Sequence, residues 1–513
     1  MTASGPGQPE PDGPSLIDEP PSASAGPQPA SLVVNSAWTI LARLLSMVSG
    51  GVLAIYAIRT LSVEAWGDYS TVISLMAIFA VFTEMGISSL TVRDMSSRPG
   101  QDGQLLALAL TAVVVTGTVS ICLLFLTALV LQFDFDYDLL LLTAAVLAVQ
   151  GLSVPIYATF TARRVLVYGA VANVGSAIAT AATGIALIAL GWGPAGLLTG
   201  ILAGHVVRWA LSYSLVRSRL SLTPRLLRDQ WGRVRGFLRA AVPIALTGGL
   251  TIVYQRLDIL MLSKLSDARE VALYSVPFTI LQYSWIVPAA VAGAYFPLLT
   301  AQLRTDREVA RNSFLLLMRF FLLMSVPFTL LLVVGGEPLL TFVFGDRYGE
   351  SADVLSVLAW ISVLGFQNYV LWYGILACHR EKDVVGIQAA GLVLNAALNV
   401  VFIPRWGGMG AAVALVISDF IVVAGQALVV HRHLFPLPLG SLLIRPLIAG
   451  AVTAPVVLLL VDVSEVLAAV SAAVVYGGVL IALRYIKPHE WQPLWQPVLG
   501  AVRRLRKKPH PVG

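Results

Sequence analysis

Charged side chains are scarce in this chain of 513 residues, of which Asp, Glu, Lys and Arg make up only 12%. An ordinary soluble domain carries about 25% charged residues. Hydrophobic residues account for 57% of the chain, and the mean hydropathy is +0.81. A single soluble core cannot bury so much apolar surface, because such cores stop growing at roughly 250–300 residues. The composition therefore excludes an ordinary soluble protein and indicates one that lies in a membrane.

Cysteine is also scarce, and the chain lacks the short motifs of common enzyme classes. The two cysteines, Cys122 and Cys378, belong to apolar runs, so neither a disulfide framework nor a metal site is expected. The sequence contains no GxxxxGK(S/T) phosphate loop and no GxSxG nucleophile elbow. We therefore expect no metal, no cofactor and no enzymatic activity.

Long apolar runs of about 20 residues follow one another from about residue 32 to about residue 484. They do not alternate between polar and apolar residues, so they predict helices and not barrel strands. The predicted fold is an all-α polytopic membrane protein of about fourteen transmembrane helices, with two pseudo-symmetric six-helix lobes plus two C-terminal helices. The predicted division is a disordered cytoplasmic tail (1–30), an N-lobe (31–216), a basic cytoplasmic linker (217–239), a C-lobe (240–441), helices thirteen and fourteen (442–484) and a basic cytoplasmic tail (485–513).

Most of the 34 Lys and Arg residues fall in alternate loops and in the C-terminal tail. This asymmetry places those loops, and both termini, on the cytoplasmic side of a multi-pass cell-membrane protein. The net charge of +6 then follows largely from topology, and no nucleic-acid partner is needed to explain it. The basic segments 217–239 and 485–513 are expected to attract anionic membrane lipids, or alternatively to dock a partner protein. The first of them also mixes Leu, Trp and Phe with its arginines, as an amphipathic surface helix does.

The sequence repeats itself at an offset of about 214 residues. Trp192-Gly193-Pro194-Ala195-Gly196 matches Trp406-Gly407-Gly408-Met409-Gly410. A stripe of small residues follows in each copy, formed by Gly196, Gly200 and Gly204 in the first and by Gly410, Ala414 and Ser418 in the second. Such stripes let helix backbones approach closely. Two repeated lobes are a common transporter plan, with the binding site between them near the bilayer midplane.

Ionisable residues inside apolar runs are costly, so they usually face the protein interior or a water-filled cavity. Arg43 lies on the first predicted helix and Arg256 on the seventh, its repeat partner. A pair of inward arginines suits an anionic, phosphate-bearing substrate. The alternative is an ion pair that only holds helices together. Glu84 is expected to lie close to Arg43, whereas Asp258 points away from Arg256 and needs another neighbour.

Two further candidates align in the repeat register, namely His205 and Asp419. Both side chains can titrate, so they are candidates for coupling to a proton or a sodium ion. The alternative is that they are hydrogen-bonded contacts between helices. Arg208, nearer the cytoplasmic end, is a further substrate-binding candidate whose role the residues alone leave open.

Several short motifs in order carry a resemblance to a known family. They are Arg59-Thr60-Leu61, Trp66-Gly67-Asp68-Tyr69, Glu84-Met85-Gly86-Ile87, Phe344-Gly345-Asp346-Arg347-Tyr348, and Asn399 through Ile403-Pro404 to Gly410-Ala411. The pattern resembles the Wzx-like branch of the multidrug/oligosaccharidyl-lipid/polysaccharide flippase superfamily. The resemblance implies two six-helix lobes around a central cavity, lined by charged residues of helices one and seven. Arg43, Arg256 and Asp258 occupy comparable places.

The resemblance also implies a function. We expect a flippase that moves a polyprenyl-pyrophosphate-linked oligosaccharide from the inner to the outer leaflet by alternating access, in contact with membrane lipids and with glycan-assembly proteins. A multidrug exporter or a lipid II flippase of the same superfamily is the alternative. An alternative of another class is a membrane glycosyltransferase or polymerase, which would use the acidic run Asp134-Phe135-Asp136-Tyr137-Asp138. The simpler interpretation of that run is a solvated acidic turn.

Overall fold

The computed structural model describes residues 29–98, 100–133, 136–225, 230–461 and 463–485. Within these residues the regular elements are helices, listed here in chain order: α1 (Pro29–Thr60), α2 (Val63–Glu84), α3 (Ile87–Ser97), α4 (Asp102–Leu131), α5 (Tyr137–Ala162), α6 (Leu166–Ala189), α7 (Gly193–Arg219), α8 (Gln230–Leu265), α9 (Ala268–Ser284), α10 (Ile286–Thr305), α11 (Arg307–Val334), α12 (Gly336–Phe344), the 3-10 helix η1 (Asp346–Ser351), α13 (Ala352–Leu358), α14 (Trp360–Ala377), α15 (Glu381–His433), α16 (Leu439–Val461) and α17 (Glu465–Ala482).

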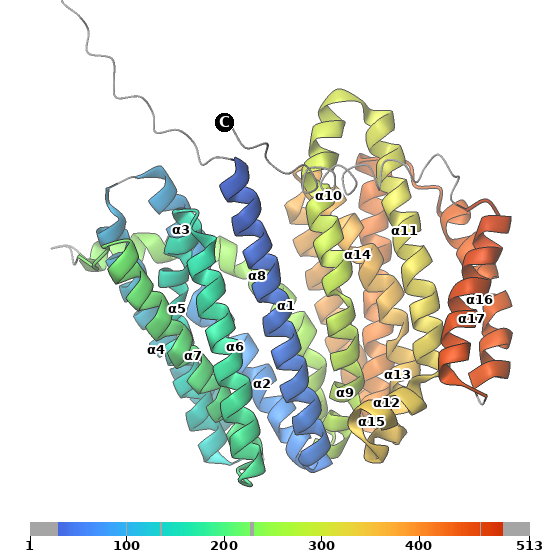
Figure 1. Cartoon of the computed structure of the whole chain (residues 1–513), viewed down its shortest axis with the longest axis horizontal. Coiled ribbons are helices and arrows are strands. Elements are labelled where there is room, and N and C mark those ends of the chain that lie inside the picture. Colours follow the sequence, from blue (N-terminus) through green and yellow to red (C-terminus); the bar gives the residue numbers. More distant parts are fainter. Residues whose placement is uncertain (1–28, 99, 134–135, 226–229, 462, 486–513) are drawn as a thin grey trace, which may run out of the picture.

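The helices form two groups that stand side by side, with α1–α7 on the left of Figure 1 and α9–α15 on the right. The last two helices, α16 and α17, lie at the outer edge of the second group (Figure 1). The prediction of an all-α membrane protein with two lobes and two additional helices is therefore confirmed. We call α1–α7 the N-lobe and α9–α15 the C-lobe.

The helices begin where a polar side chain can accept from their first N–H groups, which have no partner inside the helix. Ser62 accepts from the amide of Ala65 at the start of α2, and Asp267 accepts from the amide of Glu270 at the start of α9. Asp306 caps α11 in the same way. These caps let very short turns connect the long helices.

One helix of the C-lobe folds back on itself. At about 1.5 Å per residue, the 53 residues of α15 would be far longer than the roughly 30 Å hydrocarbon core of a bilayer. The chain reverses at Gly407, whose φ of 52° lies in the left-handed region that glycine adopts readily. A Cβ at Gly425 would lie 3.3 Å from the side chain of Ile387, so the two arms pack against each other. Element α15 is therefore a pair of spans.

Ten helices of the described chain are long and apolar enough to cross a membrane, and twelve if each of two bent pairs counts as one span. The first bent pair is α8, and the second runs from η1 to α14. The hairpin α15 is counted once in that total, and the apolar part of α17, Val470–Ala482, is shorter than the others. The count of fourteen stays a prediction.

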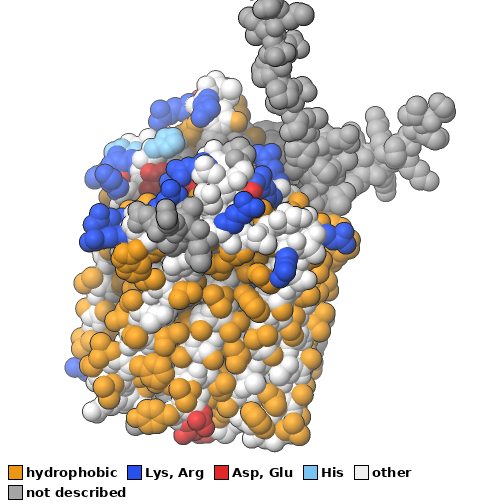
Figure 2. All heavy atoms as spheres, turned by 90° about the vertical axis from the view of Figure 1, so that its left-hand side faces the viewer, with side chains coloured by type: hydrophobic (Ala, Val, Ile, Leu, Met, Phe, Trp, Pro, Cys, Tyr) orange, Lys and Arg blue, Asp and Glu red, His pale blue; other side chains and the backbone are white. Residues whose placement is uncertain are grey.

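Most of the basic side chains visible in Figure 2 gather at one end of the molecule. Figure 2 shows Lys and Arg clustered above a broad band of hydrophobic side chains on the N-lobe side. Such a band is what a lipid bilayer requires of the surface that it surrounds. Nearly all of the predicted terminal tails, 1–30 and 485–513, lies outside the described residues, and with it their predicted character.

The predicted linker 217–239 is partly helical and does not separate the lobes cleanly. Helix α7 continues to Arg219, and α8 begins at Gln230. The first part of α8 packs onto α3 and α4 of the N-lobe through Val234, Phe237 and Ala241. Its other face exposes Trp231 and basic side chains, so its amphipathic character is confirmed. The chain then turns by 54° between Trp231–Ala245 and Gly248–Leu265 (Figure 1). The boundary predicted at residue 239 is therefore inside a helix.

The small-residue stripe of the first repeat packs as the sequence predicts. A Cβ at Gly200 of α7 would lie 2.8 Å from the Cα of Gly184 and from the backbone oxygen of Thr180, both on α6. The two backbones are therefore in direct contact, which only a residue without a side chain permits.

We expect Gly200→Ala to lower the stability of the protein by about 1–3 kcal/mol, because the added methyl group must push α6 and α7 apart. Thermal unfolding of the purified protein in detergent measures the loss. Gly477→Ala on α17 is the matched control, because a Cβ there meets no atom within 4 Å. Equal melting temperatures for the two variants would contradict the close contact.

Candidate functional site

The N-lobe holds a basic pocket with a volume of about 290 Å³. Arg43 on α1 and Arg208 on α7 line it together. The remaining lining residues are small or polar, namely Ala42, Ser46, Tyr157, Ala170, Asn173, Ser176 and Ala177. Asn173 donates a hydrogen bond to the Tyr157 hydroxyl at 3.3 Å. Two guanidinium groups and several neutral donors therefore face one space, which suits an anionic group.

Arg208 is only partly satisfied by the protein. It donates from Nη2 to Nδ1 of His205, one turn earlier on α7, at 2.7 Å. Its buried Nε has no hydrogen-bond partner. Because a buried donor without a partner is costly, this guanidinium has capacity for a further acceptor.

The predicted proximity of Glu84 to Arg43 stays a prediction. Among the ion pairs of the described residues none joins the two side chains, and the charged group near Glu84 is Arg208 of α7. Sequence reasoning missed this partner because Arg208 is on α7, and nothing in the order of the chain shows that α7 approaches the end of α2. Arg43 and Arg208 thus share a pocket in the N-lobe, with His205 bonded to Arg208 and Glu84 near Arg208.

Arg256 lies on α8 and does not line the pocket that holds Arg43. It is half-buried, and Tyr69 of α2 lies near it. The structure therefore does not bring the two predicted arginines of helices one and seven into the same pocket. The second arginine of that pocket comes from α7.

Asp258 finds its neighbours on other helices, as the sequence predicts. It is only 2% exposed. Its carboxylate accepts from Asn399 of α15 at 2.6 Å and from the Tyr274 hydroxyl of α9 at 3.0 Å. Asn399 also donates to Asn395, one turn earlier on α15, at 3.1 Å. Sequence reasoning missed the two amides, although their spacing of four residues within an apolar run places them on one helix face.

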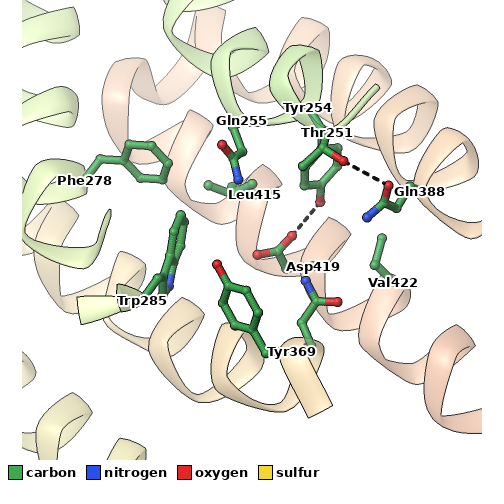
Figure 3. A pocket seen from close by; sticks show the side chains of 12 residues that line it. Thr251, Tyr254, Gln255, Phe278, Trp285, Tyr369, Gln388, Leu415, Asp419 and Val422 are labelled. Carbon is green, nitrogen blue, oxygen red and sulfur yellow. Dashed lines mark hydrogen bonds between the residues drawn. The ribbon is translucent and has the colours of Figure 1, made fainter. Parts of the chain in front are cut away.

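A second cavity, of about 80 Å³, lies between α8 and the C-lobe and is lined in part by Asp419 (Figure 3). Asp419 accepts from the Tyr254 hydroxyl at 2.6 Å, and Thr251 donates to Gln388 at 3.3 Å. Figure 3 shows Asp419, Gln255 and Tyr369 pointing toward the middle of the space. A cavity of this size holds waters or a small ion but not a sugar chain. His205 and Asp419, which align in sequence, thus lie in different lobes with different neighbours.

An apolar groove of about 340 Å³ runs between α1 and the C-lobe. Its walls are Met47, Val48, Gly51, Ala54 and Ile55 of α1, Thr279, Ile280 and Tyr283 of α9, and Leu339, Val343 and Phe344 of α12. Met47 follows Arg43 by four residues, or about 6 Å along the helix. The basic pocket and the apolar groove therefore border successive turns of α1, and they share no lining residue.

At the far end of α1 two arginines fasten the lobes to each other. Arg59 donates to the backbone carbonyls of Phe342 and Val343, the second at 2.8 Å. Arg347 of η1 donates in return to the carbonyls of Arg59 and Leu61, both at 2.6 Å. We call these four hydrogen bonds the arginine clasp. Nearby, Trp66 of α2 donates to Ser275 of α9 at 3.2 Å.

Within the part of the chain that the structure describes, no group of three or more His, Cys, Asp and Glu side chains could hold a metal ion. Asp136 of the acidic run occupies the cap position of α5, where its side chain makes no capping hydrogen bond, and Asp134 and Phe135 lie outside the described residues. Asp136 lies close enough to Asp68 of α2 for the two carboxylates to repel each other, and Glu64 of α2 is near them as well.

The family model described as "Polysaccharide biosynthesis protein" matches residues 52–353, which is more than half of the chain. The chain belongs to this family. The resemblance predicted from the sequence is thus confirmed. The match includes parts of both lobes, because residues 52–353 run from α1 to α13.

Two curated relatives of this polysaccharide biosynthesis protein match over shorter stretches. The "Putative O-antigen transporter" of Shigella flexneri is 29% identical over 162 residues, covering 31% of this chain and 37% of that protein. The "Probable low-salt glycan biosynthesis flippase Agl15" of Haloferax volcanii is 22% identical over 240 residues, covering 46% of this chain and 49% of that protein. The chain therefore spans less than half the length of these curated relatives.

Solved structures share the fold at low identity. A lipid II flippase MurJ in an inward closed conformation is 14% identical, with a TM-score of 0.63, and covers 91% of this chain and 100% of that chain. An inward-facing multidrug resistance MATE family transporter is also 14% identical, with a TM-score of 0.55, and covers 78% of this chain and 98% of that chain. These likenesses establish the two-lobe fold.

We expect Asn399→Leu to destabilise the protein by about 1–3 kcal/mol, because Asp258 would stay buried without its closest donor. Thermal unfolding in detergent measures the effect. The control is the double variant Asp258→Leu with Asn399→Leu, which removes the carboxylate and the amide together. Its loss should be smaller than the sum of the two single losses. Strictly additive losses would show that the two side chains do not depend on each other.

Proposed function

We propose that this protein is a flippase that moves a lipid-linked oligosaccharide, carried on a polyprenyl pyrophosphate, from the inner to the outer leaflet of the cell membrane. The observation that carries the proposal is the layout of α1. This helix brings Arg43 into a basic pocket and, one turn later, borders an almost wholly apolar groove. An amphiphile with a phosphate head and a long hydrocarbon tail matches that order.

The chemistry of each part fits its proposed ligand. Guanidinium groups bind phosphate oxygens in pairs, and Arg208 has a buried N–H still free to donate. The groove between α1 and the C-lobe offers a path along which the polyprenyl chain stays in an apolar environment. A charged sugar-phosphate head cannot cross hydrocarbon unaided, because the desolvation cost is too large. The protein would therefore replace water around the head while lipid still surrounds the tail.

Movement between leaflets would come from alternating access, with both termini on the cytoplasmic side. In that orientation the arginine clasp closes the outer end of the space between the lobes, because it joins the α1–α2 turn to η1. Opening the outer end requires these four hydrogen bonds to break. The lobes would then rock about their contact, as other two-lobe transporters do.

Asp419 is the better of the two ion-coupling candidates. It lines a small cavity together with neutral polar groups, where a proton or a sodium ion fits. A proton on His205 would instead place a second positive charge 2.7 Å from Arg208. We infer that the cavity beside Asp419 takes the coupling cation and that the N-lobe pocket takes the substrate, which would leave Arg256, Asp258 and Glu84 to hold the surrounding helices in place.

A lipid II flippase is the second candidate, and the fold likeness that covers 91% of the chain favours it. It would use the same pyrophosphate chemistry with a different sugar. A multidrug exporter fits less well, because organic cations need acidic groups and the N-lobe pocket presents two arginines. Contacts with glycan-assembly proteins belong to the proposal as well.

The decisive experiment is a deletion strain of the host organism. Loss of the protein should cause a lipid-linked oligosaccharide to accumulate at the inner leaflet, and the gene in trans should restore export. Complementation of a strain depleted of its lipid II flippase tests the second candidate. If no lipid-linked glycan accumulates and neither export nor lipid II transport changes, both proposals are wrong.

We expect Arg43→Gln and Arg208→Gln each to lower the rate of glycan export by about ten- to a hundredfold, since a hydrogen bond to a charged group contributes roughly 1.5–3 kcal/mol. Export is measured in the complemented deletion strain at equal protein abundance. Arg217→Gln, which removes an exposed arginine near the end of the same helix α7, should export normally. Normal export by both pocket variants would contradict the assignment of the substrate phosphate to this pocket.

We expect Arg347→Gln to open the outer end of the lobes more often, because two hydrogen bonds of the clasp are lost. In a background without native cysteine, a cysteine at Ser275 should then react about tenfold faster with a membrane-impermeant maleimide added outside. Arg269→Gln is the control, since Arg269 pairs with Glu350 of the same lobe at 2.5 Å. Unchanged labelling in Arg347→Gln would mean that the clasp does not keep the lobes closed.

A further inference from the structure

A second basic pocket, with a volume of about 430 Å³, lies outside the proposed transport path. It is formed where α3, the α3–α4 turn and the start of α4 meet the first part of α8. Its polar lining consists of Arg93, Asp94, Arg98, Gln101, Gln104 and Arg233. Its apolar lining consists of Leu105, Leu108, Phe237 and Ala240. The size is that of an ordinary small-molecule site.

The pocket is charged on one side and apolar on the other. Arg93 is paired with its neighbour Asp94 at 2.9 Å. Among the ion pairs of the described residues, none includes Arg98 or Arg233. Three arginines and one acid therefore line the pocket, so its field attracts an anion.

The pocket also has a fixed depth in the membrane. Leu105 and Leu108 belong to the first turns of α4, where a membrane-spanning helix begins. Above them are the side chains of the charged end, which Figure 2 shows bordering the hydrophobic band. Polar groups and apolar groups are thus stacked in the order in which a phospholipid arranges its headgroup and its acyl chains.

The first part of α8 places Arg233 in this pocket by its packing. Val234 and Phe237 are buried against α3 and α4, which fixes the rotation of the helix. Arg233, Arg235 and Arg239 are all exposed, but of the three only Arg233 lines the pocket. The helix thus carries one arginine inside the pocket and two matched arginines outside it.

We propose that this pocket binds the phosphate headgroup of an anionic phospholipid from the surrounding leaflet. Arg98 and Arg233 hold the phosphate, Gln101 and Gln104 offer hydrogen bonds to the headgroup alcohol, and Leu108 and Phe237 contact the first carbons of the lipid. Because Arg98 follows α3 of the N-lobe whereas Arg233 belongs to the helix that leads into the C-lobe, the bound lipid fastens the bent arm of α8 to the N-lobe.

The experiment titrates the purified full-length protein in neutral detergent with phosphatidylglycerol. It follows binding by native mass spectrometry and by the melting temperature. Phosphatidylcholine and soluble glycerol 3-phosphate are the comparison arms. Phosphatidylglycerol should bind and raise the melting temperature, whereas neither comparison ligand should do so at the same concentration. Equal effects of glycerol 3-phosphate would overturn the lipid as the source of the phosphate, and equal effects of phosphatidylcholine would overturn the role of charge.

The double variant Arg98→Gln with Arg233→Gln should bind phosphatidylglycerol about thirtyfold more weakly, since each basic residue near an anionic lipid contributes about 1 kcal/mol. Arg235→Gln with Arg239→Gln removes the same charge from the same end of the molecule and should retain the wild-type affinity. Equal weakening in the two double variants would overturn the proposal, because attraction would then depend on net charge and not on the pocket. The measurement involves no transport, so its failure would leave the proposed flippase function untouched.

Discussion

A guanidinium group inside a membrane-spanning helix cannot be left to hydrocarbon, and this constraint organises the N-lobe. The charge must be stabilised by a carboxylate, by several polar groups or by a polar ligand. Each of these interactions holds neighbouring helices in position. Arg208 donates a hydrogen bond to a nitrogen of His205 and is attracted by the negative charge of Glu84. Its buried Nε–H group still has no hydrogen-bond partner. Arg43 shares its pocket. The close contact of α6 and α7 at Gly200 holds that arrangement without any polar bond.

The two lobes descend from one pattern but differ in charge. The pocket of the first copy presents Arg43 and Arg208, with His205 bonded to Arg208, whereas the second copy places Asp258 and Asp419 among tyrosines and amides. A repeated backbone therefore supports a basic pocket in one half and an acidic cavity in the other. The proposed division of work, with substrate phosphate on one side and a coupling cation on the other, follows from that difference.

The fold could be predicted further than the site. Hydrophobic run lengths, loop charges and the small-residue stripes each report a local property, so they predicted two lobes, two additional helices and the contact at Gly200. The partner of Glu84 and the separation of Arg43 from Arg256 depend on which helices meet, and spacing along one helix carries no such information. Asn395 and Asn399 could have been found, because two amides in an apolar run are unusual enough to mark a buried contact.

The arginine clasp has a consequence for how the sequence can change. Every acceptor in it is a main-chain carbonyl, at residues 59, 61, 342 and 343. The residues at positions Leu61, Phe342 and Val343 can therefore be substituted during evolution without loss of a hydrogen-bond acceptor. The number of residues between Arg59 and the start of α2 cannot drift in the same way, since one insertion would rotate the carbonyls out of reach. The clasp therefore constrains the length of the α1–α2 turn more strictly than the identity of its residues.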